Sequence, residues 1–479
     1  MRLVFDMVHS IYKKSKELVK SHWVVFLFAI SFVAALLNIL IFYPGNLSSD
    51  SIWQLEQAVA GRYSDWHPPV MAIIWHYLIT LTGKVSSLLI FSISLLWASL
   101  FMMARVVFIK TGSFRRSLLP FLLGISPLVL SISGVLWKDV FGAFLILLTI
   151  ALAETFQVSK VGTSATRKFK DYRVVYIVGT ILIFISGVSM RHNLIIISPF
   201  MAAYFTKVYD INFVKRMNIK QWLSLGLNAG ILTFFIILGF FSFTKTIDRI
   251  WNVEHLYPQN VLYVDDILRV ASDVDILSYK DMQEDQRQYL VDLKKVFQST
   301  PLGTSYILSQ EARKIKNGDI ISSSILSLGD DELKGLWTDT IIRHKNEYIS
   351  KKIDLYKGFI LDGGQYIWYP GVEENDLGVA TKFSGAQRKL STYVNFTSRD
   401  FGFIFRPYFW ILNSVVLFCY VYRKRSSLVE GGQLLSLAGL AYILFYLPFV
   451  LAYDYRYIFP SVILISLAGI ITFNREKIN

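Results

Sequence analysis

Long apolar runs separated by short polar segments set the pattern of this 479-residue chain. A helix needs about 20 apolar residues to cross the hydrocarbon core of a bilayer, and several of the runs reach that length. The pattern therefore predicts an all-α polytopic membrane protein with about ten membrane spans. The predicted spans are residues 22–43, 85–107, 117–134, 136–156, 174–190, 194–207, 222–245, 406–422, 431–453 and 457–473.

One apolar stretch does not fit this row of spans. Residues 68–83 read PPVMAIIWHYLITLTG; they begin with two prolines and are short for a span. Counting them as a span would also place the basic segment 105–116 on the outer side of the membrane. We therefore predict an interfacial helix that lies on the outer surface.

Composition favours the same class of protein. The chain is 53% hydrophobic and 18% charged, whereas a soluble protein carries about 25% charged residues. A formal charge of +14 would suit a nucleic-acid partner if the basic residues formed one soluble face. Here they stand in short clusters between apolar runs, so we expect no nucleic acid. The single cysteine, Cys419, lies in an apolar run and predicts neither an intrachain disulfide nor a cysteine metal cluster.

The basic residues orient the chain, because cytoplasmic membrane loops carry an excess of Lys and Arg. Six segments hold 23 of these residues, whereas the short segments on the other side hold few. This bias predicts that both termini are cytoplasmic. A basic start and no small-residue cleavage site predict a retained first helix. The Lys- and Ile-rich composition indicates a bacterial plasma membrane. The six segments are 1–21, 105–116, 157–173, 207–220, 423–425 and the C-terminus.

Three regions follow from this topology. Residues 1–245 form an N-terminal membrane module whose first outer loop is 44–84, and residues 406–479 form the C-terminal membrane helices. Residues 246–405 mix charged stretches with aromatic and glycine-rich turns, and they contain no internal repeat. We expect them to fold as a mixed, mainly helical extracytoplasmic domain.

Ionisable residues gather in the short outer segments, which contain SSDSIWQ, GRYSDWHPP, LWKD, MRHN and DYRYIFP. Ionisable groups at membrane depth cost roughly 2.5–3.5 kcal/mol and tend to be functional. Their convergence on one side predicts a common outward-facing cavity. We predict catalytic roles for Asp50 and Asp139. Substrate-binding roles are predicted for Asp65, His67, Lys138, Arg191, His192 and Arg456, with Asp454 close by.

Most of these residues also have a structural interpretation. His67, before Pro68 and Pro69, could simply end one helix and begin another, and His192 could be structural. Asp50 could cap a short helix, and Lys138 could pair locally with Asp139. Arg191 and Arg456 could anchor the chain at lipid headgroups. The outer carboxylates Asp265, Asp266 and Asp273 loosely resemble a metal-binding group. A divalent cation is therefore possible, although no metal ligand is assigned.

The chemistry that suits such a site is the transfer of a sugar from a lipid phosphate to a hydroxyl. One carboxylate removes the proton of the acceptor as it attacks. Fixed cations stabilise the charge that develops on the departing phosphate. A single inverting displacement needs no second carboxylate as nucleophile, and the lipid tail keeps the reaction at the helix ends.

The order of these elements and motifs resembles the GT-C glycosyltransferase superfamily, whose members use polyprenyl-phosphate-linked sugars, and within it a bacterial cell-envelope group. The resemblance covers residues 22–245 and, more weakly, 406–473. It implies that Asp50 is the general base, that His67 lies near the donor phosphate in an [HK]PP element, and that Asp139 is the second acidic residue. Arg456 corresponds to a late cationic residue.

The function implied by the resemblance is inverting transfer from a polyprenyl-phosphate sugar to an envelope glycan or glycolipid acceptor. Two departures leave the acceptor and the metal dependence open: the outer domain has no matching acceptor motif, and the first loop lacks the paired acidic residues of metal-dependent members. The alternatives are a transporter or flippase, or a polymerase, of lipid-linked saccharides. Transporters often contain internal repeats, and this chain shows none.

Overall fold

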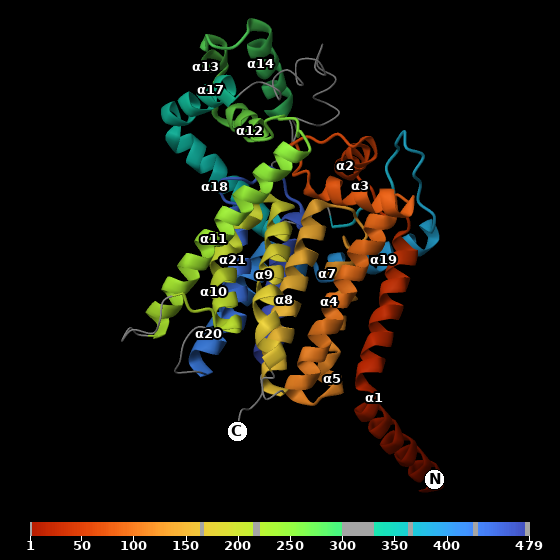
Figure 1. The fold of residues 1–479 in the computed structure, drawn as a ribbon. Helices are drawn as coiled ribbons and strands as arrows, with labels where there is room; N and C mark the ends of the chain where they lie inside the picture. Colours follow the sequence, from red (N-terminus) through yellow and green to blue (C-terminus); the bar gives the residue numbers. More distant parts are fainter. Residues whose placement is uncertain are drawn as a thin grey trace.

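The computed structural model describes residues 2–162, 167–213, 221–298, 330–362, 367–424 and 430–474. Within these ranges the regular secondary structure is helical, and extended pairing is limited to isolated bridges. Figure 1 shows a bundle of long helices with a group of shorter helices at one end.

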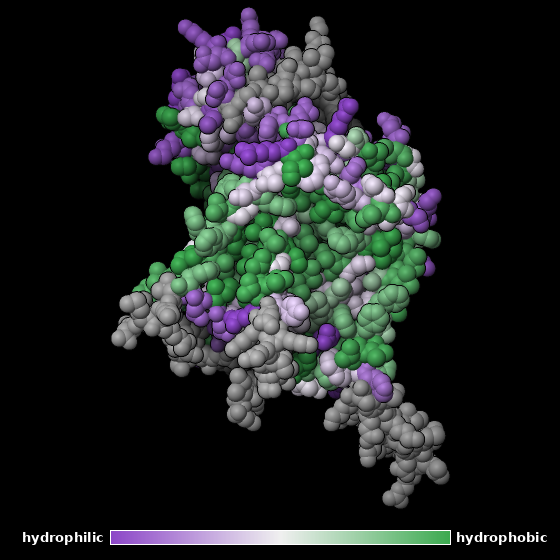
Figure 2. Space-filling view, viewed as in Figure 1, coloured by the Kyte–Doolittle hydropathy of each residue, from purple (hydrophilic) through white to green (hydrophobic). Residues whose placement is uncertain are grey.

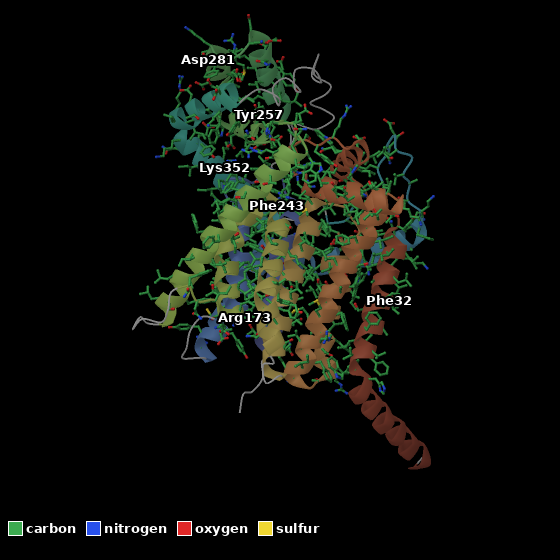
Figure 3. The ribbon with its side chains drawn as sticks, viewed as in Figure 1. Phe32, Arg173, Phe243, Tyr257, Asp281 and Lys352 are labelled. Carbon is green, nitrogen blue, oxygen red and sulfur yellow. The ribbon has the colours of Figure 1, made fainter. Side chains whose placement is uncertain are left out.

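Five helices are long and apolar enough to cross a membrane, which confirms a helical membrane protein. They correspond to five of the predicted spans. Phe32, labelled in Figure 3, is 58% exposed on the first of them, as expected of a side chain that faces lipid. Figure 2 shows the apolar band that such side chains form across the bundle. The five helices are α1 (Arg2–Phe42, apolar from His22), α4 (Ser87–Thr111), α8 (Lys138–Gly162), α9 (Arg167–Ser189) and α11 (Gln221–Ile250).

The remaining predicted spans are shorter or interrupted. Residues 117–134 do not form one helix, because Pro120, Gly124 and Pro127 divide the segment into short pieces. The helices of the last two predicted spans pack against each other in the bundle interior, where one also contacts α8. The elements are α5 (Phe114–Ser117), α6 (Leu119–Gly124), α7 (Pro127–Leu130), η1 (His192–Ile197), α10 (Ser198–Tyr209), α20 (Pro407–Lys424), α21 (Gly431–Phe445), η3 (Tyr455–Tyr457) and α22 (Phe459–Phe473).

The stretch predicted to be interfacial forms α3 (Val70–Thr82), which packs against α2 (Ser49–Ala60) and α4. Figure 1 shows α2 and α3 at the end of the bundle that also bears the group of shorter helices. Trp75 is fully buried and donates to the carbonyl of Val85 at 2.8 Å. Tyr77 is 52% exposed. α3 therefore presents one face to the protein and leaves the other uncovered.

A helical cap stands at this end of the bundle. It consists of α12 (Asn260–Val270), α13 (Asp273–Ser278), α14 (Glu284–Gln298) and α17 (Asp330–Arg343), and it has its own apolar core. Its surface is hydrophilic (Figure 2). α18 (Lys345–Asp362) joins the cap to α20. Lys352 of α18, labelled in Figure 3, is buried and pairs with Asp266 of α12 at 2.5 Å.

Candidate functional site

Three segments that are far apart in the sequence meet just before α2. The Asn46 N–H donates to the carbonyl of Gly134 at 2.8 Å, and the Leu136 N–H donates to the carbonyl of Asn46 at 3.1 Å. The Leu47 N–H donates to the carbonyl of Gly371 at 3.0 Å. These bonds hold the first loop against the segment that leads into α8 and against a segment that follows α18. They place Asp50 beside the start of α8.

The Asp50 carboxylate lies at the centre of the cluster. Its Oδ2 accepts from Arg456 Nη1 at 2.6 Å, and its Oδ1 lies 3.7 Å from His67 Nε2. Burial by itself would raise the pKa of Asp50, but Arg456, His67 and Lys138 hold that pKa well below its usual value. Asp50 is therefore ionised at neutral pH. The helix-cap interpretation does not describe this contact, because Ser48 occupies the N-cap position.

His67 connects Asp50 to Lys138. Its Nδ1 lies 2.5 Å from the Lys138 ammonium, and an ammonium can only donate. The ring proton of neutral His67 is therefore on Nε2, the nitrogen that faces Asp50. Burial and the charge of Lys138 lower the pKa of His67 to about 4. Nε2 is buried and has no hydrogen-bond partner among the described residues, so its N–H is left to donate beside Asp50.

Arg456 lies between two carboxylates and two aromatic rings. Its Nε is 2.9 Å from Asp454 Oδ2. Its guanidinium lies 4.7 Å from the Trp137 ring centroid and 5.4 Å from that of Tyr457, a cation–π geometry. The Trp137 indole in turn donates to Ser48 Oγ at 2.7 Å. Arg456 is thus held inside the protein and is only 19% exposed, unlike a side chain that anchors at headgroups.

Asp139 belongs to a second, deeper ion pair. Its Oδ1 contacts Arg191 Nη1, and the carboxylate is only 1% exposed. The Arg191 guanidinium lies 4.6 Å from the Tyr457 centroid and 5.8 Å from that of Tyr446. Lys138 and Asp139 are sequence neighbours but have different partners, since Lys138 contacts His67. The local pair between them is replaced by two contacts with distant segments.

Asp65 and His192 lie outside this contact network. Asp65 accepts from His255 Nδ1 at 2.9 Å and from the backbone N–H of Leu256 at 2.6 Å. It thereby ties the loop between α2 and α3 to the segment between α11 and α12. His192 is exposed and packs edge-on against Phe240 of α11 at 5.6 Å.

Tyr369 is a site residue that sequence reasoning missed. Its ring packs edge-on against Trp137 with centroids 4.6 Å apart, and its carbonyl accepts from the Asn46 side chain at 2.6 Å. Burial, with added effects of Asp454 and Asp50, raises the pKa of Tyr369 to about 12. Its hydroxyl is therefore protonated and lies near these carboxylates. The segment YIWYPG signals only a turn in the sequence, so nothing local indicates this position.

The carboxylates of Asp50, Asp139 and Asp454 differ in how much of their surface is exposed to solvent. The Asp50 side chain is 34% exposed, whereas those of Asp139 and Asp454 are 1% and 6% exposed. A proton acceptor must come within hydrogen-bond reach of an external substrate. Asp50 is the carboxylate of these three that meets this requirement.

The structure offers no metal-binding group within the part of the chain that it describes. No three or more His, Cys, Asp or Glu side chains gather there in a way that could hold an ion. The cap carboxylates noted in the sequence each have a cationic partner. Asp265 pairs with Arg269, Asp266 with Lys352, and Asp273 with Lys294.

Comparisons of the chain with protein-family models, with curated proteins and with solved structures found no match. The protein is thus defined by its fold and its cluster of charges: a helical membrane protein with an accessible carboxylate beside Arg456, His67 and Lys138.

The lowered pKa of His67 predicts that the protein loses stability in mild acid. The pKa is about 4 in the folded protein, against 6.5 for the free side chain. Between these pH values the unfolded chain binds a proton that the folded protein does not. Stability that is fully present above pH 6.5 therefore falls as the pH drops towards 4, by about 3 kcal/mol at most.

Thermal unfolding of the purified protein at pH 7 and pH 5 measures this effect. The midpoint of the wild-type protein should fall between the two, and that of His67→Gln should fall less, since glutamine can accept from Lys138 but does not titrate. Equal decreases in both proteins would show that His67 is not the titrating group.

Proposed function

We propose that the protein is an inverting glycosyltransferase that moves a sugar from a polyprenyl-phosphate donor to an extracytoplasmic cell-envelope glycan or glycolipid. The observation that carries the proposal is the Asp50 carboxylate, partly exposed and flanked by Arg456 and by the His67–Lys138 pair. A base and several anion-binding groups are the parts that this reaction needs.

Each residue has one role in the proposed step. Asp50 Oδ1 accepts the proton of the acceptor hydroxyl, and the oxygen of that hydroxyl forms the new bond to the anomeric carbon. The bond between that carbon and the phosphate oxygen breaks on the opposite side, so the configuration inverts and the lipid phosphate leaves. Arg456 and Lys138 stabilise its negative charge, and His67 holds the Lys138 ammonium in place through its Nδ1.

The proposed architecture is GT-C-like with about ten spans. The five long apolar helices would be joined by α10, α20, α21, α22 and the broken segment α5–α7. α3 would lie at the outer surface, and a lipid-linked donor would reach the cluster from the bilayer. A divalent cation is not required by the proposed step.

The test of this function is transfer by the purified protein in lipid nanodiscs. Polyprenyl-phosphate sugars are supplied as donors together with envelope glycans and glycolipids as acceptors, and free lipid phosphate and the elongated acceptor are measured. Formation of both products supports the enzyme. Movement of the intact lipid-linked saccharide across vesicles, without release of lipid phosphate, would identify a transporter instead.

We further propose that the cap lies outside a bacterial plasma membrane and that both termini are cytoplasmic. The clustered Lys and Arg residues support this orientation, and Figure 1 places α5 and the start of α1 at the end opposite the cap. In a Cys419→Ser background, Lys280→Cys in the cap should react with an impermeant maleimide in intact cells. Arg116→Cys should react only after the cells are opened. The reverse labelling pattern would invert the scheme.

A further inference from the structure

Two tryptophans form a stacked pair beside the catalytic carboxylate. The rings of Trp53 and Trp66 are 5.7 Å apart with an interplanar angle of 14°. Trp53 follows Asp50 by three residues on α2, so both side chains lie on one side of that helix. Trp66 directly precedes His67, and the Trp53 ring meets His67 edge-on at 6.1 Å. The pair therefore adjoins Asp50, which would accept the proton of the acceptor, and His67, which holds Lys138 in place.

The two rings of the pair differ in exposure, because Trp53 is exposed and Trp66 is half-buried. Trp53 is 38% exposed, whereas Trp75, Trp97 and Trp137 are each at most 2% exposed. Neither Trp53 nor Trp66 donates its indole N–H to another group among the described residues. Leaving an indole face in water forgoes the gain from burying its apolar area. A ligand that covers the face and accepts from the N–H groups would recover both.

The chemistry of the pair selects the class of ligand. A sugar ring offers an apolar C–H face to the indole and hydroxyl oxygens to its N–H, whereas an acyl chain offers no acceptor. Figure 1 shows α2 and α3 at the end of the bundle that bears the cap, and the surface of the cap is hydrophilic in Figure 2. Trp53 lies on α2 and Trp66 in the loop that follows α2. The pair therefore belongs to this end of the bundle, where we expect it to meet a ligand from the aqueous side.

We propose that Trp53 and Trp66 form a stacking platform for a pyranose ring of the acceptor saccharide. The platform holds that ring so that one of its hydroxyls, or a hydroxyl of the adjoining sugar, reaches Asp50. The naming of the saccharide as the acceptor rests on the proposed function. Binding by the platform does not, because it can be measured without transfer.

Binding is tested with the full-length protein in nanodiscs on an array of bacterial envelope oligosaccharides, and the best-bound oligosaccharide is then titrated by calorimetry. Trp53→Leu should weaken binding about tenfold or more, the size of one aromatic stacking contact. Trp53→Phe should restore a large part of the affinity. Tyr77→Leu is the matched control, because Tyr77 is an exposed aromatic residue on the adjacent α3, and it should bind like the wild type.

Several outcomes would overturn the platform. These are an absence of oligosaccharide binding by the wild type, unchanged binding by Trp53→Leu, or an equal loss in Tyr77→Leu. Quenching of Trp53 by lipids brominated near the headgroup, measured as the difference between wild type and Trp53→Leu, would instead identify a membrane anchor.

A parallel transfer assay separates this inference from the proposed function. If the wild type transfers sugar and Trp53→Leu keeps the same KM for the acceptor, the platform is wrong and the enzyme stands. If Trp53→Leu loses oligosaccharide binding while the wild type transfers nothing from any donor, the platform stands and the proposed function is wrong. If both hold, the acceptor KM rises in Trp53→Leu with a smaller change in kcat.

Discussion

Asp50→Asn should abolish most sugar transfer while the protein still folds and binds its donor. Asparagine keeps the size of the side chain and can still accept from Arg456, but it cannot take up a proton. General-base catalysis contributes roughly 10²- to 10⁴-fold, and the loss in kcat should lie in that range. Release of lipid phosphate by equal amounts of purified wild-type and variant protein measures it, and donor titration shows that binding is retained.

Glu56→Gln is the matched control for this substitution. Glu56 is an exposed carboxylate on the same helix, so the change from carboxylate to amide is the same but lies away from the cluster. Its transfer rate should equal that of the wild type. If Asp50→Asn transfers sugar at a near-normal rate, Asp50 has a structural role and the proposed mechanism is wrong.

Helix length explains which parts of the fold could be predicted from the sequence. The five long apolar helices were predicted because each carries an uninterrupted run that covers a bilayer. The segment 117–134 is as apolar but is broken, since Pro120 and Pro127 cannot continue a helix in the usual way. Short buried helices such as α22 have only 15 residues, so their apolar runs include flanking turns that hydropathy alone cannot separate.

The site could be predicted as a group but not as a set of contacts. Charge bias predicted that Asp50, His67, Lys138 and Arg456 lie on the same side of the membrane, and they lie together in the structure. Asp50 and Arg456 are 406 positions apart, and no local pattern assigns one to the other. Tyr369 belongs to the segment that follows the cap helices and α18. No local sequence pattern indicates that this segment packs against the first loop.

The contact between Asp139 and Arg191 also joins residues that are far apart in the sequence, so no local pattern predicted it. Breaking this buried ion pair should have a large effect on stability. Removing one partner leaves the other as an uncompensated buried charge, which costs about 3–5 kcal/mol. Asp139→Asn and Arg191→Met should each lower the thermal midpoint and the yield of folded protein strongly. The decrease should exceed that of Lys207→Met, in which a more exposed contact between Lys207 and Glu430 at 4.0 Å is lost.

A double substitution decides between a structural pair and a catalytic one. Asp139→Leu combined with Arg191→Met removes both charges and should recover most of the stability, because an apolar pair of similar volume can replace a buried ion pair. If transfer returns with stability, the pair only supports the site. If the double variant is stable but no longer binds donor, the pair takes part in donor binding, in agreement with the substrate-binding role predicted for Arg191. Asp139→Asn alone tests the remaining alternative. If this variant is stable and binds donor but transfers no sugar, Asp139 is the base, even though it is buried in an ion pair.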